Sequence, residues 1–249
     1  MSEPEPEPDP GARRPLHVRN VALIQKLAKI LSQKDVTPNQ ISLASIGFAA
    51  LAGVSCIGMG SFTGALGLFF SLLALAGIAG RVLCNLFDGL VAVEGGKRTK
   101  SGEMFNDVPD RIGDALILVG MGYAVSFGGI GAMLGWGAAL MAVMTAYART
   151  LGRSLGAPVD FSGPMAKPHR MGVAAVAIFL TPFEGFVFSK GTMLVFGLVI
   201  IIAGSAWTTW NRLRNAYEHI EFGVTEEDSV FEAEDDQQED AEVNEDSHA

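Results

Sequence analysis

Acidic and amide side chains gather in residues 81–114, at the ends of two strongly apolar stretches. If these apolar stretches cross a membrane, charged side chains at their ends are costly to bury, so a functional site is the default interpretation. Their spacing predicts two helical faces, which carry Asn85, Asp88, Gly89 and Ala92 at i, i+3, i+4 and i+7, and Asn106, Asp110 and Asp114 at i, i+4 and i+8. Two such helices side by side would direct oxygen ligands toward one another, which predicts a divalent-cation site suited to pyrophosphate chemistry.

This spacing resembles the signature of the CDP-alcohol phosphatidyltransferases, which reads Asp-x2-Asp-Gly-x2-Ala-Arg-x8-Gly-x3-Asp-x3-Asp. The positions matched without a gap are Asp88, Gly89, Ala92, Gly102 and Asp110. Three positions depart from the signature: Asn85 and Asn106 stand where aspartates are expected, and Val93 replaces the arginine. The resemblance covers residues 85–110.

The resemblance implies transfer of a phosphatidyl or other phospho-alcohol group from a CDP-alcohol, most simply CDP-diacylglycerol, to an acceptor hydroxyl, with release of CMP in phospholipid biosynthesis. Such chemistry needs Mg²⁺ or Mn²⁺ to neutralise the pyrophosphate and a general base for the acceptor. By position, the resemblance assigns the metal to Asn85, Asp88, Asn106 and Asp110, and the nucleotide to Gly89, Ala92 and Gly102. It also makes Asp110 the catalytic base or a ligand of a second metal ion.

The two asparagines leave the composition of the metal site open. Asn85 and Asn106 can coordinate through their amide oxygens but bring no charge, so one metal ion or a loosely held pair is expected. Asp114 is near enough in sequence to restore charge. Pro109 removes one helical hydrogen bond and can kink this segment.

Further basic residues adjoin two later apolar stretches: Arg149, Arg153, Lys167 and Arg170. Arginine binds phosphate through two parallel hydrogen bonds. The resemblance implies that basic residues here contact the donor phosphates or a polar acceptor, and Arg149 and Arg170 are the candidates because each abuts an apolar stretch. The alternative is anchoring to lipid headgroups.

The apolar stretches predict an all-α integral membrane protein with six transmembrane helices. A helix needs about 20 apolar residues to cross the hydrocarbon core. Six stretches are candidates: residues 41–62, 64–86, 112–129, 131–152, 171–189 and 191–210. Before them, residues 16–36 predict an amphipathic helix at the membrane interface, and Thr37 with Pro38 can cap and begin the first span.

The chain of 249 residues is 49% hydrophobic, with a net charge of −9. Residues 1–9 and 221–249 hold 17 of the 27 acidic residues and no basic one, so the intervening region is basic and suits anionic lipids and phosphorylated substrates. We expect residues 1–15 and 221–249 to be disordered tails. Residues 37–220 would form a single membrane domain.

The basic residues also predict an orientation. Of the 18 Lys and Arg residues, 17 fall on one side of the predicted spans, and Lys190 alone falls on the other. This asymmetry places both termini and the acidic residues in the cytoplasm, in a multi-pass protein of the cell membrane. The expected partners are membrane lipids, a CDP-linked lipid donor and a small polar alcohol; the resemblance allows a homodimer, and no nucleic acid is expected.

Two other functions remain open. Residues 106–114 spell Asn-Asp-x2-Asp-x3-Asp, which is similar to the first motif of UbiA-type intramembrane prenyltransferases. Those enzymes need a second acidic motif, and the later spans offer only Glu184, at the opposite face. The other alternative is a catalytically inactive, lipid- or partner-binding member of the phosphatidyltransferase fold. The asparagines and Val93 favour it, whereas the retained Asp88 and Asp110 argue against it.

Overall fold

The computed structural model describes residues 37–94, 102–125, 129–186 and 188–223. The predicted tail over residues 1–15, the predicted amphipathic helix over residues 16–36 and residues 224–249 of the second predicted tail lie outside the described residues. The first two residues of that second tail, Glu221 and Phe222, belong to α7. Within the described residues the fold is all-helical and contains no strand. The helices are α2 (Pro38–Ser61), α3 (Gly64–Glu94), α4 (Gly102–Ala124), α5 (Gly129–Ser154), α6 (Lys167–Leu180), the 3-10 helix η3 (Thr181–Phe186) and α7 (Thr192–Phe222).

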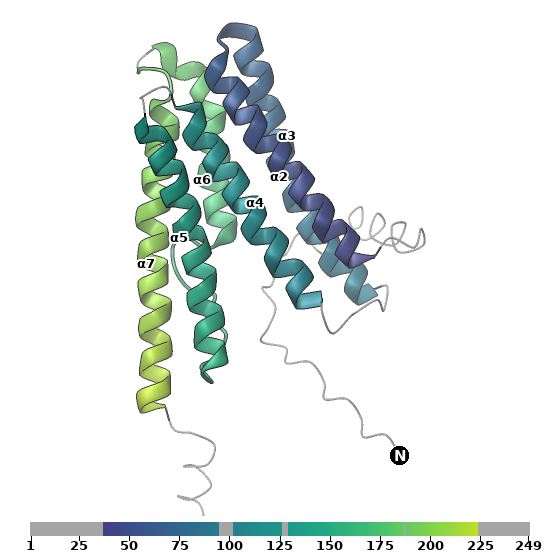
Figure 1. Cartoon of the computed structure of the whole chain (residues 1–249), viewed down its shortest axis with the longest axis vertical. Helices are drawn as coiled ribbons and strands as arrows, with labels where there is room; N and C mark the ends of the chain where they lie inside the picture. Colours follow the sequence, from purple (N-terminus) through teal and green to yellow (C-terminus); the bar gives the residue numbers. More distant parts are fainter. Residues whose placement is uncertain (1–36, 95–101, 126–128, 187, 224–249) are drawn as a thin grey trace, which may run out of the picture.

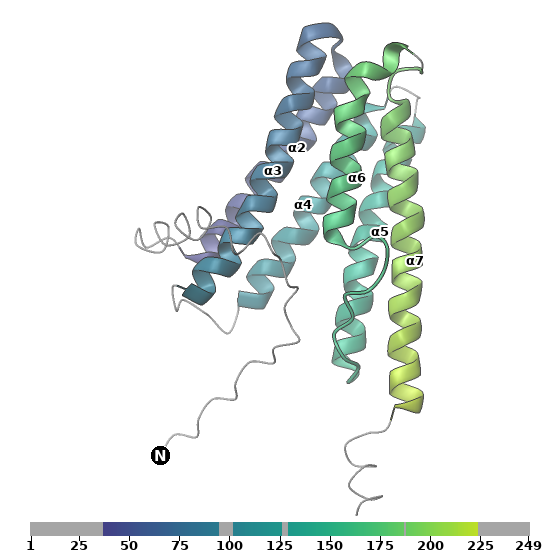
Figure 2. The same ribbon diagram turned by 180° about the vertical axis from the view of Figure 1, so that it is seen from behind.

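The helices form an elongated bundle with α4 at its centre (Figure 1). The α2–α3 pair packs on one side of α4, and α5 packs on the other side and against α7. Seen from behind, α6 lies between α3 and α7 (Figure 2). The carboxyl end of α3 and the amino end of α4 lie at the same end of the bundle, which we call the motif end.

Among the helices that the structure describes, four are long and apolar enough to cross a membrane: α2, residues 64–92 of α3, α5 and α7. These helices indicate a membrane protein. The other two predicted spans differ from the expectation. The third begins at Gly102, ten residues early, and so gains four charged residues that precede the predicted span: Glu103, Asp107, Asp110 and Arg111. The fifth ends as an α-helix at Leu180, and its 14 residues reach about 21 Å, less than a hydrocarbon core of about 30 Å.

The start of α2 follows from its first residues. The Thr37 hydroxyl oxygen accepts a hydrogen bond from the Gln40 backbone N–H at 3.3 Å, and the Gln40 side chain accepts one from the Thr37 N–H at 3.0 Å. This reciprocal capping box satisfies two backbone donors that have no partner within the helix. Pro38 occupies the first turn, as predicted, where its missing N–H costs nothing.

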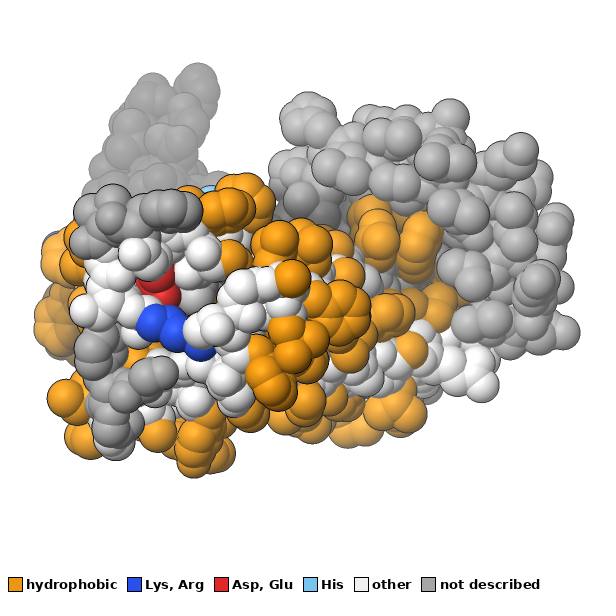
Figure 3. All heavy atoms as spheres, turned by 90° about the horizontal axis from the view of Figure 1, so that it is seen from above, with side chains coloured by type: hydrophobic (Ala, Val, Ile, Leu, Met, Phe, Trp, Pro, Cys, Tyr) orange, Lys and Arg blue, Asp and Glu red, His pale blue; other side chains and the backbone are white. Residues whose placement is uncertain are grey.

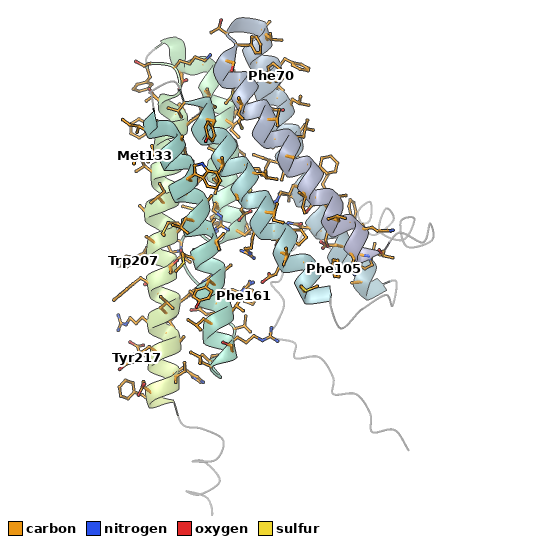
Figure 4. All side chains as sticks on the ribbon, in the orientation of Figure 1. Phe70, Phe105, Met133, Phe161, Trp207 and Tyr217 are labelled. Atoms are coloured by element: carbon orange, nitrogen blue, oxygen red, sulfur yellow. The ribbon has the colours of Figure 1, made fainter. Side chains whose placement is uncertain are left out.

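Small residues let α2 and α4 approach closely. A methyl group added at Gly53 would lie 2.4 Å from the carbonyl oxygen of Leu116, and one added at Gly120 would lie 2.4 Å from that of Gly53. Close backbone contact of this kind is typical of helices packed within membranes. Large apolar side chains face outward instead: Met133 on α5 and Trp207 and Tyr217 on α7 lie at the outer edge of the bundle (Figure 4).

The end opposite the motif end has few charges on its surface (Figure 3). There, the Lys190 ammonium donates to the carbonyl oxygens of Gly60 and Phe62, at 2.7 Å each, and so ties the start of α7 to the α2–α3 turn. The Glu184 carboxylate accepts hydrogen bonds from the backbone N–H groups of Gly191 and Met193. Glu184 thereby caps the amino end of α7. This gives a structural role to the one acid that the later predicted spans could offer to the prenyltransferase alternative.

Candidate active site

Asp88 lies near the motif end of α3 and is almost fully buried, with 4% of its surface exposed. Its Oδ2 lies 2.8 Å from the hydroxyl of Ser42, a buried residue of α2. That hydroxyl is also 3.1 Å from the carbonyl oxygen of Pro38, but the charged carboxylate is the stronger acceptor. Ser42 therefore fixes the orientation of Asp88.

Asp110 lies on α4 and meets groups from two other helices. Its Oδ1 accepts a hydrogen bond from the side-chain nitrogen of Asn85 on α3, at 3.0 Å, and forms an ion pair with the ammonium of Lys167, the first residue of α6. The guanidinium of Arg81 lies 3.7 Å from the same oxygen and donates to the backbone carbonyl of Asp110 at 2.9 Å. The carboxylate is thus surrounded by hydrogen-bond donors and positive charge.

A fully buried ion triad lies beneath Asp110. The Asp114 carboxylate pairs through one oxygen with Arg81 and through the other with Arg170, at 2.5 Å each. Arg170 also donates to the Thr145 hydroxyl and the Met165 carbonyl. All three charged residues are at most 1% exposed. Buried charges are tolerated when they are paired and hydrogen-bonded, as these are. Because Arg81 belongs to α3, Asp114 to α4 and Arg170 to α6, the triad joins these three helices.

Gly113 provides the space for this triad. A methyl group added at Gly113 would lie 2.5 Å from Nε of Arg81, one of the few buried side-chain atoms without a hydrogen-bond partner among the described residues. Glycine is therefore required here by the close approach of a guanidinium. Arg81 is one of the 17 basic residues on the side of the spans predicted to be cytoplasmic, and in the structure it lies inside the bundle.

A second, more exposed ion pair links α4 to α5. Arg149 donates to both carboxylate oxygens of Asp107, at 3.1 and 3.3 Å, and its guanidinium lies 5.4 Å from the ring centroid of Phe161. Arg111 contacts the same carboxylate at 3.3 Å. Figure 4 shows Phe161 close to the motif-end half of α5. This arrangement brings Arg149 to α4, three residues before Asp110.

Arg149 also lines a cavity of about 250 Å³, between the ends of α5 and α7 and the segment that follows α5. The polar residues of its wall are Arg149, Asp160, Arg212 and Asn215. Burial favours the neutral form of Asp160, but hydrogen bonds from Ser162 and Asn215 outweigh this effect and hold the pKa of Asp160 below its usual value. The cavity thus contains an ionised carboxylate together with two guanidinium groups.

The structure brings some predicted site residues together and separates others. Asn85 and Asp110 are in direct contact, and Asp88 follows Asn85 on the same face of α3. Asn106 is exposed on α4, and Gly89, Ala92 and Gly102 are partly buried near the motif end. Arg170 departs most from the expectation for a phosphate-binding residue, because its guanidinium is buried against Asp114. α4 continues through Pro109 without interruption.

Two residues of the site, Ser42 and Lys167, are not among the site residues predicted from the sequence. Ser42 contacts Asp88 from 46 residues away, and Lys167 contacts Asp110 from 57 residues away. The sequence marks Lys167 as one of several basic residues in its segment, but its proximity to Asp110 follows only from the packing of α6. No local sequence signal singles out Ser42 as a partner of Asp88.

The donor set limits what metal site can form. Hard divalent ions favour several charged oxygen ligands, and the described residues contain no group of three or more His, Cys, Asp and Glu side chains able to hold a metal ion. Asp88 and Asp110 provide two carboxylates. Because an ionised carboxylate only accepts hydrogen bonds, Asn85 faces Asp110 with its nitrogen and keeps its amide oxygen for another partner. Asp88 and Asp110 are therefore the carboxylates, and the Asn85 amide oxygen the neutral donor, that this part of the site offers to a divalent ion.

No family model matches the sequence, and no curated protein matches it. The fold nevertheless resembles solved structures of phosphatidylinositol phosphate synthase (PgsA1) from Mycobacterium tuberculosis. The structure with CDP-DAG bound has a TM-score of 0.64 at 18% identity and covers 78% of this chain and 94% of that chain. The structure in complex with manganese and citrate has a TM-score of 0.65 at 18% identity and covers 78% of this chain and 88% of that chain. The apo form has a TM-score of 0.62 at 17% identity and covers 77% of this chain and 95% of that chain. At these identities the likeness establishes the fold: this chain has the helical architecture of that synthase.

Proposed function

We propose that this protein transfers a phosphatidyl or related phospho-alcohol group from a CDP-alcohol, most simply CDP-diacylglycerol, to an acceptor hydroxyl. The acceptor oxygen forms a new bond to phosphorus, the bond between that phosphorus and the CMP oxygen breaks, and CMP leaves. One observation carries the proposal. Asp88 and Asp110, in register with the phosphatidyltransferase signature, are buried and held by hydrogen bonds at one end of a fold shared with a synthase solved with CDP-DAG bound.

Asp110 is the proposed general base. The acceptor hydroxyl has a high pKa, so its proton must pass to a nearby group as the new bond forms. Asn85 and Lys167 keep the Asp110 carboxylate in place, and Arg81 holds the adjoining backbone. Mg²⁺ or Mn²⁺, if bound by Asp88, Asp110 and the amide oxygens of Asn85 and Asn106, would neutralise the charge of the pyrophosphate.

Further residues are assigned by position. Gly89, Ala92 and Gly102 are proposed to allow the nucleotide to approach the backbone near the motif end. Arg149 is proposed to contact the acceptor, because it lines the cavity between α5 and α7 and reaches Asp107 of α4. For Arg170 we propose a positioning role in place of phosphate binding, since its guanidinium is bound to Asp114.

The placement in the cell follows from the charge distribution. We propose a multi-pass protein of the cell membrane, with a membrane domain over residues 37–220 and with the motif end and both termini in the cytoplasm. A homodimer remains a proposal from the resemblance alone.

A catalytically inactive, lipid-binding member of the fold is the second candidate. It is favoured by the contact between Asn85 and Asp110, where the signature calls for two acids. An assay of the purified protein with CDP-diacylglycerol, a panel of alcohols and Mg²⁺ or Mn²⁺ separates the two functions. The proposal predicts CMP release that depends on an acceptor and a metal ion, whereas the inactive alternative predicts lipid binding without CMP release.

A further inference from the structure

The ion pair between Lys167 and Asp110 brings a positive charge of the protein itself into the candidate active site. We infer that the Lys167 ammonium, through its ion pair with Asp110, supplies a positive charge to this site, and that it allows the site to work with one divalent ion in place of two. The inference deepens the proposed function, because it concerns how the charge of the CDP-alcohol is neutralised. It is carried by the position of Lys167 and by the two asparagines.

The charge of the site differs from that of the complete signature. Four aspartates would present four negative charges, which two divalent ions would balance. Here Asn85 and Asn106 are neutral, and Lys167 adds one positive charge to the two negative charges of Asp88 and Asp110. A single divalent ion therefore leaves this set with a net positive charge, which suits a pyrophosphate ligand.

Lys167 is held in place by the helix that it begins. Arg170, one turn further along α6, is anchored to Asp114 in the buried triad. That anchor fixes the amino end of α6 beside α4, so Lys167 faces Asp110 from a defined position. The Lys167 side chain is 27% exposed, and so it is reachable by a ligand. An ammonium has three N–H donors, and the contact with Asp110 does not exhaust them.

This arrangement has a consequence that a purely structural lysine would not have. A divalent ion bound by Asp110 is repelled by the ammonium, which also competes with it for the carboxylate. Removing the charge of Lys167 should therefore strengthen metal binding while it weakens turnover. A lysine that merely supports the fold would, on removal, weaken both.

The test is Mn²⁺ binding to the purified full-length protein in detergent, followed by the paramagnetic resonance signal of free Mn²⁺. The variants are Lys167→Met, which removes the charge, Lys167→Arg, which retains it, and Arg214→Met, which removes an exposed charge of α7. Asp88→Asn identifies the site, because it should abolish tight binding and leave only weak binding by the acidic tail.

We expect one tight Mn²⁺ per wild-type chain, and binding about tenfold or more tighter in Lys167→Met. Lys167→Arg and Arg214→Met should bind Mn²⁺ as the wild type does. Two tightly bound Mn²⁺ ions per wild-type chain would overturn the inference, and this measurement does not depend on the folding of any variant. Unchanged or weaker Mn²⁺ binding by a folded Lys167→Met protein would also overturn it. CMP release from the same samples tests the proposed function separately: tighter binding in Lys167→Met without CMP release by the wild type would refute the proposed function and leave the inference about charge intact.

Discussion

The side-chain nitrogen of Asn85 lies 3.0 Å from Oδ1 of Asp110, so an uncharged donor of α3 contacts the carboxylate proposed as the general base. An aspartate at position 85 would instead place two negative oxygens against one another, and a bound divalent cation would reduce their repulsion. Asn85 therefore stabilises the site without metal more than an aspartate would, but it offers a divalent ion a neutral ligand in place of a charged one.

Asn85→Asp should make the protein more dependent on metal. Without metal, the repulsion between the new carboxylate and Asp110 should lower the melting temperature in detergent. With Mg²⁺ or Mn²⁺ present, the added charge should lower the half-saturating metal concentration about tenfold. Thermal melting at a series of metal concentrations measures both effects. An Asn85→Asp protein that melts like the wild type at every metal concentration would mean that residue 85 does not face the metal.

Asp114→Asn should destabilise the fold. The change leaves the two buried guanidinium groups of Arg81 and Arg170 with no carboxylate between them, which costs about 3–5 kcal/mol. Chemical denaturation in detergent measures the loss. Glu218→Gln is the matched control, because it breaks an exposed pair with Arg214 that contributes about 0–1 kcal/mol. Equal stabilities of the two variants would show that the triad is not structural.

Ser42→Ala should reduce turnover without unfolding the protein. It removes the hydroxyl that orients the buried Asp88, a hydrogen bond to a charged group whose loss should lower the rate of CMP release by about 10- to 100-fold. Ser45→Ala is the control, because the Ser45 hydroxyl is equally buried on α2 but donates to the Ser42 carbonyl. If Ser45→Ala slows the reaction as much as Ser42→Ala, the contact with Asp88 has no special role.

The proposed orientation can be tested in intact cells with single added cysteines. Arg214→Cys, at the motif end of α7, should react only with membrane-permeant thiol reagents, whereas Ser189→Cys, at the opposite end, should react with impermeant ones. The native Cys56 and Cys84 are buried, so the wild type should give a low background. The reverse labelling pattern would place the site outside the cell.

The spacing of a few residues predicted that two helices would bring Asn85 and Asp110 together, and the two side chains are in contact. Because α3 and α4 are regular helices, residues at i, i+3 and i+4 share a face. Packing of the two helices then brings Asn85 to Asp110. It could not reveal Ser42 or Lys167, whose contacts depend on how α2 and α6 pack. The described residues confirm the all-helical class. This class could be predicted because long apolar stretches are a property of the local sequence.

Two differences between the expectation and the structure have identifiable physical causes. Arg170 shares its helix face with the buried Ala174 and Ile178, so the apolar spacing of α6 was a signal that this arginine is buried, and its charge was given more weight. The fifth predicted span ran through Pro182, where the α-helix has already given way to η3. A hydropathy average over about 20 residues does not detect where an α-helix ends, because Pro182 and its neighbours are apolar or small although proline disrupts the helix.

The most direct test of the proposed function compares CMP release from CDP-diacylglycerol by the wild type and by Asp110→Asn, each with a panel of alcohols and with Mg²⁺ or Mn²⁺. We predict that the wild type releases CMP only when an acceptor and a metal ion are present, and that Asp110→Asn is slower by about 10²–10⁴-fold, the usual contribution of a general base. Glu218→Gln should keep the wild-type rate. A folded Asp110→Asn protein that releases CMP as fast as the wild type, or a folded wild type that releases none with any acceptor, would contradict the proposal.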